Sequence, residues 1–183
     1  SVCLSVCLSV CLSVCLCVCT QSTCEHVDAV FSQCDSRWGS DIMEVKTICQ
    51  VGCLMSSISM ALNGWNITID GASSNPATLN TWLQANGGYV DGDDLEEEVV
   101  YKIEPSAIKY WGNFTFRCTG SPLPSLLLQR TVVIANVDNG GHFVLVTGYS
   151  PANEDMWYVN DPGFNRASYN TTDIVGFRIF LIT

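Results

Sequence analysis

The chain has 183 residues, enough for one domain with a hydrophobic core, and we expect a single domain that acts as a monomer. Its 8 basic and 18 acidic residues give a formal net charge of -10, which disfavours binding to nucleic acid or to an anionic membrane surface. The sequence has only two histidines, no zinc-binding spacing and no glycine-rich phosphate loop, so no metal ion or other cofactor is expected.

The start of the chain is a short repeat. Six of the eleven cysteines fall in the first twenty residues, where the unit SVCL is repeated four times. A tandem TCTG tetranucleotide encodes this unit, so residues 1–24 are interpreted as a translated microsatellite outside the fold, and the domain is assigned to residues 25–183. Two alternatives stay open. One is the apolar region of a signal peptide, and the weaker one is a transmembrane helix, which the serines interrupt.

Five cysteines lie beyond residue 20, namely Cys24, Cys34, Cys49, Cys53 and Cys118. If the domain is exported, an odd number leaves one thiol to be explained. Three N-x-S/T sequons are also present, at Asn66, Asn113 and Asn170. These sequons permit secretion without demonstrating it. The expected location is secreted or lysosomal/vacuolar.

The residues before Cys53 predict an irregular start to the domain, and those after it predict a helix. Residues 25–47 mix turn-forming and scattered apolar residues, which indicates an extended segment at the domain edge. From Cys53 to Leu62 the apolar residues recur at helical spacing, and Asn63-Gly64 is a fitting end. A buried helix is therefore expected here.

Two further helices are expected in the middle of the chain. One spans Ala77–Ala85, between Pro76 and the run Asn86-Gly87-Gly88. The other is acidic and begins near Asp93, because carboxylates early in a helix interact favourably with the helix dipole.

The second half of the chain predicts strands. Four short runs are rich in β-branched and aromatic residues, at 131–137, 142–149, 156–160 and 176–182. Residues 138–141, with the sequence DNGG, are expected to join the first two runs as a hairpin turn. Helices followed by an antiparallel sheet give an α+β fold, in which the helical half packs on one face of the sheet.

Cys53 is the candidate nucleophile, although most free cysteines are simply small buried apolar residues. Its position at a helix N-terminus favours a thiolate, and a nearby histidine would favour it further. His142, at the start of a strand, is the candidate base, since His26 lies in the irregular leader. Asp161 ends the next expected strand. Consecutive antiparallel strands bring His142 and Asp161 to the same end of a sheet, where the carboxylate can orient the imidazole.

Several segments also resemble a known family. They are FSQCDSRWGSD at residues 31–41, ICQVGCLMSSISMALNG at 48–64, and further along NPATLNTWLQANGGYV, GHFVLVTGY and WYVNDPGF. Together they are similar to the peptidase C39-like family of papain-like cysteine peptidases, over roughly residues 30 to 183. The resemblance implies a papain-like fold, with Cys53 as nucleophile, His142 as base and Asp161 as its orienting partner. It also implies Gln33 as an oxyanion donor, for which Gln50 is the rival.

Three functions are compatible with this sequence. The leading hypothesis is a thiol hydrolase that cleaves a peptide or amide bond through a Cys53 thioester. The alternatives are a catalytically inactive binding domain on the same fold and a cell-wall amidase of the NlpC/P60 type. A further hypothesis concerns the cysteines: Cys34 pairs with Cys49, and Cys24 pairs with Cys118, which leaves Cys53 free.

Overall fold

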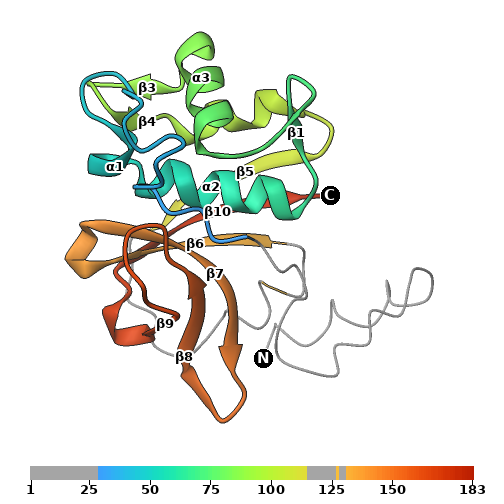
Figure 1. The fold of residues 1–183 in the computed structure, drawn as a ribbon. Helices are drawn as coiled ribbons and strands as arrows, with labels where there is room; N and C mark the ends of the chain where they lie inside the picture. The colour runs from blue at the N-terminus through green and yellow to red at the C-terminus, as the bar shows by residue number, and fades with distance from the viewer. Residues whose placement is uncertain (1–28, 115–126, 128–130) are drawn as a thin grey trace.

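The structure is a computed structural model that describes residues 29–114, residue 127 and residues 131–183 (Figure 1). The tract at residues 1–24 therefore lies outside the described residues. So does the expected pairing of Cys24 with Cys118.

The first half of the described chain holds the α-helices and two small hairpins. The helices are α1 (Ile48–Val51), α2 (Cys53–Gly64), α3 (Pro76–Asn86) and a 3-10 helix, η1 (Glu97–Ile103). One hairpin pairs β1 (Thr68–Ile69) with β2 (Ala72–Ser73), and the other pairs β3 (Tyr89–Val90) with β4 (Asp94–Leu95). The helices expected from Cys53 and from Ala77 are confirmed.

The limits of α3 follow from local chemistry. The side chain of Asn75 accepts hydrogen bonds from the backbone amides of Ala77 at 2.9 Å and Thr78 at 3.1 Å, and Pro76 occupies the first turn. Gly87 ends the helix with a φ of 69°, in the left-handed region that glycine adopts at low energetic cost. The capping residues therefore set both ends of this helix.

Among the described residues, six strands form one antiparallel sheet in the order β5-β10-β6-β7-β8-β9. They are β5 (Ile108–Phe114), β6 (Thr131–Val137), β7 (His142–Ser150), β8 (Asn153–Asn160), β9 (Ser168–Asn170) and β10 (Gly176–Ile182). Two 3-10 turns, η2 (Asp138–Gly140) and η3 (Thr171–Asp173), follow β6 and β9. All four expected strands are present, whereas β5 and β9 were not expected.

The hairpin between β6 and β7 fixes the register on which the site depends. Asp138 and Asn139 have positive φ values of 50° and 55°, and Val137 lies opposite His142. Asn and Asp tolerate this conformation better than most residues. The expected turn is confirmed, and it places His142 at the first position of β7.

Both faces of β6, a central strand of the sheet, are largely buried. On one face, Val132 and Ile134 of β6 pack with Met55 and Ile58 of α2, which lies against β6 and β7 (Figure 1). On the other face, alternate residues of β6 join a second cluster around Trp157. A helical half packed on a large antiparallel sheet fits the expected α+β class.

The prediction of an acidic helix that begins near Asp93 is wrong. Residue 93 lies in the β3–β4 hairpin, where Asp91 and Gly92 have φ values of 47° and 95°. The Asp93 carboxylate accepts backbone hydrogen bonds from Glu44 and Val45, both at 2.8 Å. These long-range bonds stabilise a turn, and only a 3-10 helix follows, from Glu97.

The leader segment is less extended than expected. Turns occupy much of residues 33–40, and an isolated bridge pairs Ile42 with Thr47. The indole of Trp38 is buried and donates to the carbonyl of Ser32 at 2.8 Å. These contacts fold the segment into a compact loop against α1.

Candidate active site

The sheet brings His142 and Asp161 together as expected. His142 begins β7, and Asp161 directly follows β8, whose last residue, Asn160, lies opposite Leu145. His142 Nε2 and Asp161 Oδ1 are 2.7 Å apart, and their side chains are 7% and 0% exposed. The pair is therefore a buried imidazole–carboxylate contact at one end of the sheet.

The Asp161 carboxylate is fully engaged. Its Oδ1 also accepts the backbone amides of Gly163 at 2.8 Å and Phe164 at 2.9 Å, and its Oδ2 accepts the Tyr169 hydroxyl at 2.8 Å. Burial alone would raise the pKa of Asp161, but the hydrogen bonds, led by that from His142, lower it. Asp161 is consequently a carboxylate at neutral pH.

The imidazole of His142 carries charge in this setting. Burial opposes that charge, but the hydrogen bond to Asp161 and the nearby side chain of Cys53 raise the pKa of His142 to about 9. Because Nε2 faces Asp161, Nδ1 is the ring nitrogen left for Cys53. The Cys53 side chain thus lies near the His142–Asp161 pair.

Cys53 stands at the head of α2 and is partly buried. Of the three cysteines in the described part of the chain, it is the free one. Gly52 before it has a packing role, because a Cβ there would lie 2.6 Å from the carbonyl oxygen of Ile48 and 2.7 Å from its Cγ2. This close approach lets α2 begin directly after α1, with Cys53 in the first turn, where amide groups lack helical partners.

Gln33 lies between the two halves of the site. Its backbone amide donates to the carbonyl of Pro162 at 2.8 Å, and its Nε2 donates to the carbonyl of Cys49 at 2.8 Å. One of the two Nε2 hydrogens makes that bond, so the other can serve a second acceptor. Gln33 Oε1 is buried without a hydrogen-bond partner among the described residues. A Cβ on Gly163 would come 3.4 Å from this oxygen.

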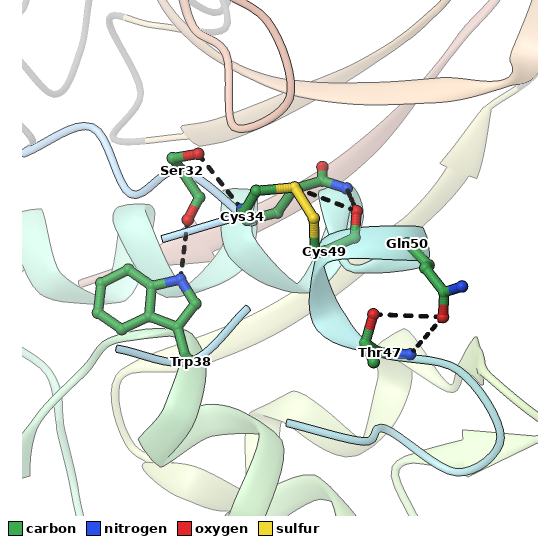
Figure 2. Close-up of a disulfide and its surroundings, with 7 residues drawn as sticks. Ser32, Cys34, Trp38, Thr47, Cys49 and Gln50 are labelled. Atoms are coloured by element: carbon green, nitrogen blue, oxygen red, sulfur yellow. Dashed lines mark hydrogen bonds between the residues drawn. A yellow bond between two sulfur atoms is a disulfide. The ribbon is translucent and has the colours of Figure 1, made fainter. Parts of the chain in front are cut away.

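Gln50, the rival oxyanion donor, has another contact. Its Oε1 accepts the backbone amide of Thr47 at 3.0 Å and the Thr47 hydroxyl at 3.2 Å, which closes a capping box at the start of α1 (Figure 2). This contact directs the amide toward Thr47. The geometry therefore favours Gln33 over Gln50.

The expected disulfide between Cys34 and Cys49 is present (Figure 2). It joins the residue after Gln33 to α1, the helix that precedes Cys53. The Cys49 carbonyl that accepts from Gln33 belongs to the same bridged residue. The disulfide and this hydrogen bond thus hold Gln33 against the start of the helical half.

Two residues at the site were not assigned a role from the sequence. Tyr169 lies on β9, whose three residues are too short to show strand alternation, and its hydroxyl reaches Asp161. Phe164 stacks edge-on against the His142 ring, with 4.9 Å between ring centroids. The segment DPGF that carries Phe164 was part of the resemblance and is the one signal that pointed to it.

Within residues 29–114, 127 and 131–183, no three His, Cys, Asp or Glu side chains gather closely enough to hold a metal ion. In the same part of the chain, no helix is both long and apolar enough to cross a membrane. The disulfide is compatible with an extracellular location.

Comparison with known proteins identifies a family. The model of the Peptidase_C39 like family matches residues 30–180. No curated protein matches the chain.

Proposed function

Because the chain belongs to the Peptidase_C39 like family, we propose that it is a thiol hydrolase that cleaves a peptide or amide bond, with Cys53 as its nucleophile. The observation that carries this proposal is the buried pair of His142 and Asp161, 2.7 Å apart, together with a Cys53 side chain near enough to raise the pKa of the same imidazole. A nucleophile, a base and an orienting group in this order are the arrangement required for covalent catalysis.

In the first chemical step, the Cys53 sulfur attacks the carbonyl carbon of the scissile bond, and a carbon–sulfur bond forms. His142 gives its Nδ1 proton to the departing nitrogen as the carbon–nitrogen bond breaks. The raised pKa of His142, about 9, keeps the imidazole protonated at neutral pH for this transfer. The products are a free amine and a thioester on Cys53.

In the second step, water hydrolyses the thioester. The imidazole, now neutral, takes a proton from the water as its oxygen attacks the thioester carbon. The carbon–sulfur bond breaks, a carboxylic acid leaves, and the Cys53 sulfur and protonated His142 are restored. Asp161 does not gain a proton in either step. It fixes the ring and stabilises the imidazolium.

Gln33 is the proposed oxyanion donor. Its Nε2 already donates to the Cys49 carbonyl, one helical turn before Cys53, and its second hydrogen is available for the oxygen that becomes negative in both steps. The amides in the first turn of α2 are the other donors at hand. Gln50 is not needed in this scheme, because its amide caps α1.

We propose a papain-like division of labour between the two halves. The helical half provides Gln33 and Cys53, and the sheet half provides His142 and Asp161. The substrate would lie where these halves meet. The protein would act as a monomer without a cofactor, on peptide or amide substrates, in a secreted or lysosomal/vacuolar location that suits its disulfide.

The decisive experiment measures reactivity and cleavage on the full chain. Non-reduced protein is treated with iodoacetamide at pH 6, and peptide mapping follows alkylation at Cys53 alone, with His142→Ala as the control. A library of peptides from a digested proteome is then offered to native and Cys53→Ala protein. Rapid Cys53 labelling that depends on His142, together with cleavage lost in Cys53→Ala, supports the proposal. An unreactive Cys53 and no cleavage would favour a binding domain.

A further inference from the structure

Phe164 is a water-exposed aromatic ring beside the proposed base. Its exposed fraction is 58%, against 49% for Trp111 and 41% for Tyr101, so it is the most exposed of the large aromatic side chains in the described residues. One exposed apolar side chain is ordinary in itself. Phe164 differs because its ring contacts a buried, functional group.

The contact with His142 is defined. The ring centroids are 4.9 Å apart and the planes meet at 73°, an edge-to-face arrangement that aromatic rings prefer. His142 is 5% exposed, whereas Phe164 keeps more than half of its surface in water. The ring of Phe164 therefore forms an apolar surface next to His142 that a bound molecule can reach.

The backbone holds Phe164 in this place. Its amide donates at 2.9 Å to Asp161 Oδ1, the same oxygen that contacts His142. Gly163 lets the turn wrap closely around the imidazole, because a Cβ there would lie 2.8 Å from His142 Cε1. The aromatic ring and the imidazole are thus fixed to one buried carboxylate.

The proposed chemistry indicates which part of the substrate lies beside Phe164. In the proposed mechanism His142 protonates the departing nitrogen, so the leaving side of the substrate must lie beside the His142 ring. Phe164 covers part of that ring's surroundings with apolar surface. A leaving group that carries an apolar side chain would bury surface against Phe164, and a glycine would not.

We infer that Phe164 determines specificity for an apolar residue immediately after the scissile bond, an inference that rests on the proposed function. Differences in apolar contact of this kind discriminate between substrates by about 10-fold or more in kcat/KM. The favoured substrate is a peptide whose leaving amine belongs to a residue with a Leu- or Phe-like side chain.

The test uses quenched fluorescent peptides built on a sequence that the native full chain cleaves. Four peptides differ only in the residue after the scissile bond, which is Phe, Leu, Ser or Gly. We expect native protein to favour Phe and Leu. Phe164→Ala should lower kcat/KM by at least about 10-fold for these two and by less than about 2-fold for Gly. Phe164→Leu, which keeps an apolar side chain, should retain most of the preference.

Trp111→Ala is the matched control. Trp111 is an exposed aromatic residue on β5, which β10 and β6 separate from β7 in the sheet. This variant should leave all four rates unchanged. Thermal unfolding of each variant checks that the substituted proteins are folded.

The outcomes separate the inference from the function on which it rests. Equal losses for all four peptides in Phe164→Ala would show that the ring only shields His142, and would overturn the inference while leaving the hydrolase intact. The inference would also be overturned, with the hydrolase left intact, if Phe164→Ala had the same kcat/KM values as native protein. The same holds if native protein showed no preference for Phe and Leu. Absence of cleavage combined with an unreactive Cys53 would overturn the function and the inference together.

Discussion

The two segments that meet at the candidate site are held by different kinds of bond. Gln33 and Cys53 lie just outside the two ends of a loop that the Cys34–Cys49 disulfide closes. His142 and Asp161 are held by hydrogen bonds among buried polar groups. A covalent link is insensitive to protonation, whereas the second arrangement depends on it. The two segments should therefore lose their structure under different conditions. Reduction should affect the segment next to the disulfide, and a change of pH should affect the segment that holds His142 and Asp161.

A backbone hydrogen bond connects the two segments at the site. Gln33 donates its amide to the carbonyl of Pro162, the residue after Asp161, at 2.8 Å. Displacing either segment consequently disturbs the other. A change confined to one segment therefore shows how far its effect reaches into the other.

The largest expected effect comes from removing Cys53, the proposed nucleophile. Cys53→Ala should lower kcat by at least about 10,000-fold, because the thioester can no longer form. The fold should survive, since Cys53 is only partly buried. His142→Ala should give a similar loss, and the double variant should be no worse than either alone because the two residues act as a unit. Additive losses in steady-state assays would contradict this pairing.

The next effect concerns the protonation of His142 in the sheet half. The pKa of His142 is raised from 6.5 to about 9, so its contribution to stability is complete below pH 6.5 and is lost as the pH rises through 9. The free energy of unfolding should therefore fall by at most about 3 kcal/mol across this range. Urea unfolding at several pH values measures the fall.

His142→Gln is the control for that experiment, because glutamine fills similar space but does not titrate. It should flatten the pH dependence between pH 6.5 and 9. A slope as steep as that of the native protein would show that another group is responsible.

The disulfide tests the other segment. The double variant Cys34→Ser/Cys49→Ser opens a loop with a sequence separation of 15 and should destabilise the fold by about 3 kcal/mol. Gln33 loses its tether as well, so kcat should fall more than KM rises. Urea unfolding and steady-state kinetics measure the two effects, and a loss of stability without any change in kcat would disconnect the disulfide from Gln33.

The smallest effect is expected from Tyr169→Phe. This change removes one hydrogen bond to the charged Asp161 and should lower the free energy of unfolding by about 1 to 2 kcal/mol. Tyr158→Phe, on the adjacent strand β8, removes a hydroxyl outside the Asp161 contacts and serves as the control. Equal effects of the two substitutions, measured by urea unfolding, would count against a specific role for Tyr169.

The sequence predicted well what short-range chemistry decides. The DNGG turn fixed the register of β6 and β7, and hence the position of His142, and the end of the next strand placed Asp161 beside it. The prediction from the sequence failed where contacts between residues far apart in the chain decide the local structure. The sequence predicted that a helix begins near Asp93. In the structure, the Asp93 carboxylate instead accepts hydrogen bonds from backbone amides nearly fifty residues earlier. Tyr169 was missed because three residues show no periodicity.

The spacing of Cys49 and Cys53 has a consequence for oxidative folding. In a flexible chain, Cys49 meets Cys53, four residues away, more readily than Cys34, because closing a short loop loses less entropy. Neighbours four apart on a helix have Cβ atoms about 5 to 6 Å apart, whereas a disulfide needs about 3.5 to 4.5 Å. Helix formation on both sides of Gly52 before oxidation would thus protect the Cys53 thiol from capture. We expect the order of these two events to set the yield of protein in which Cys34 is paired with Cys49 and Cys53 is free.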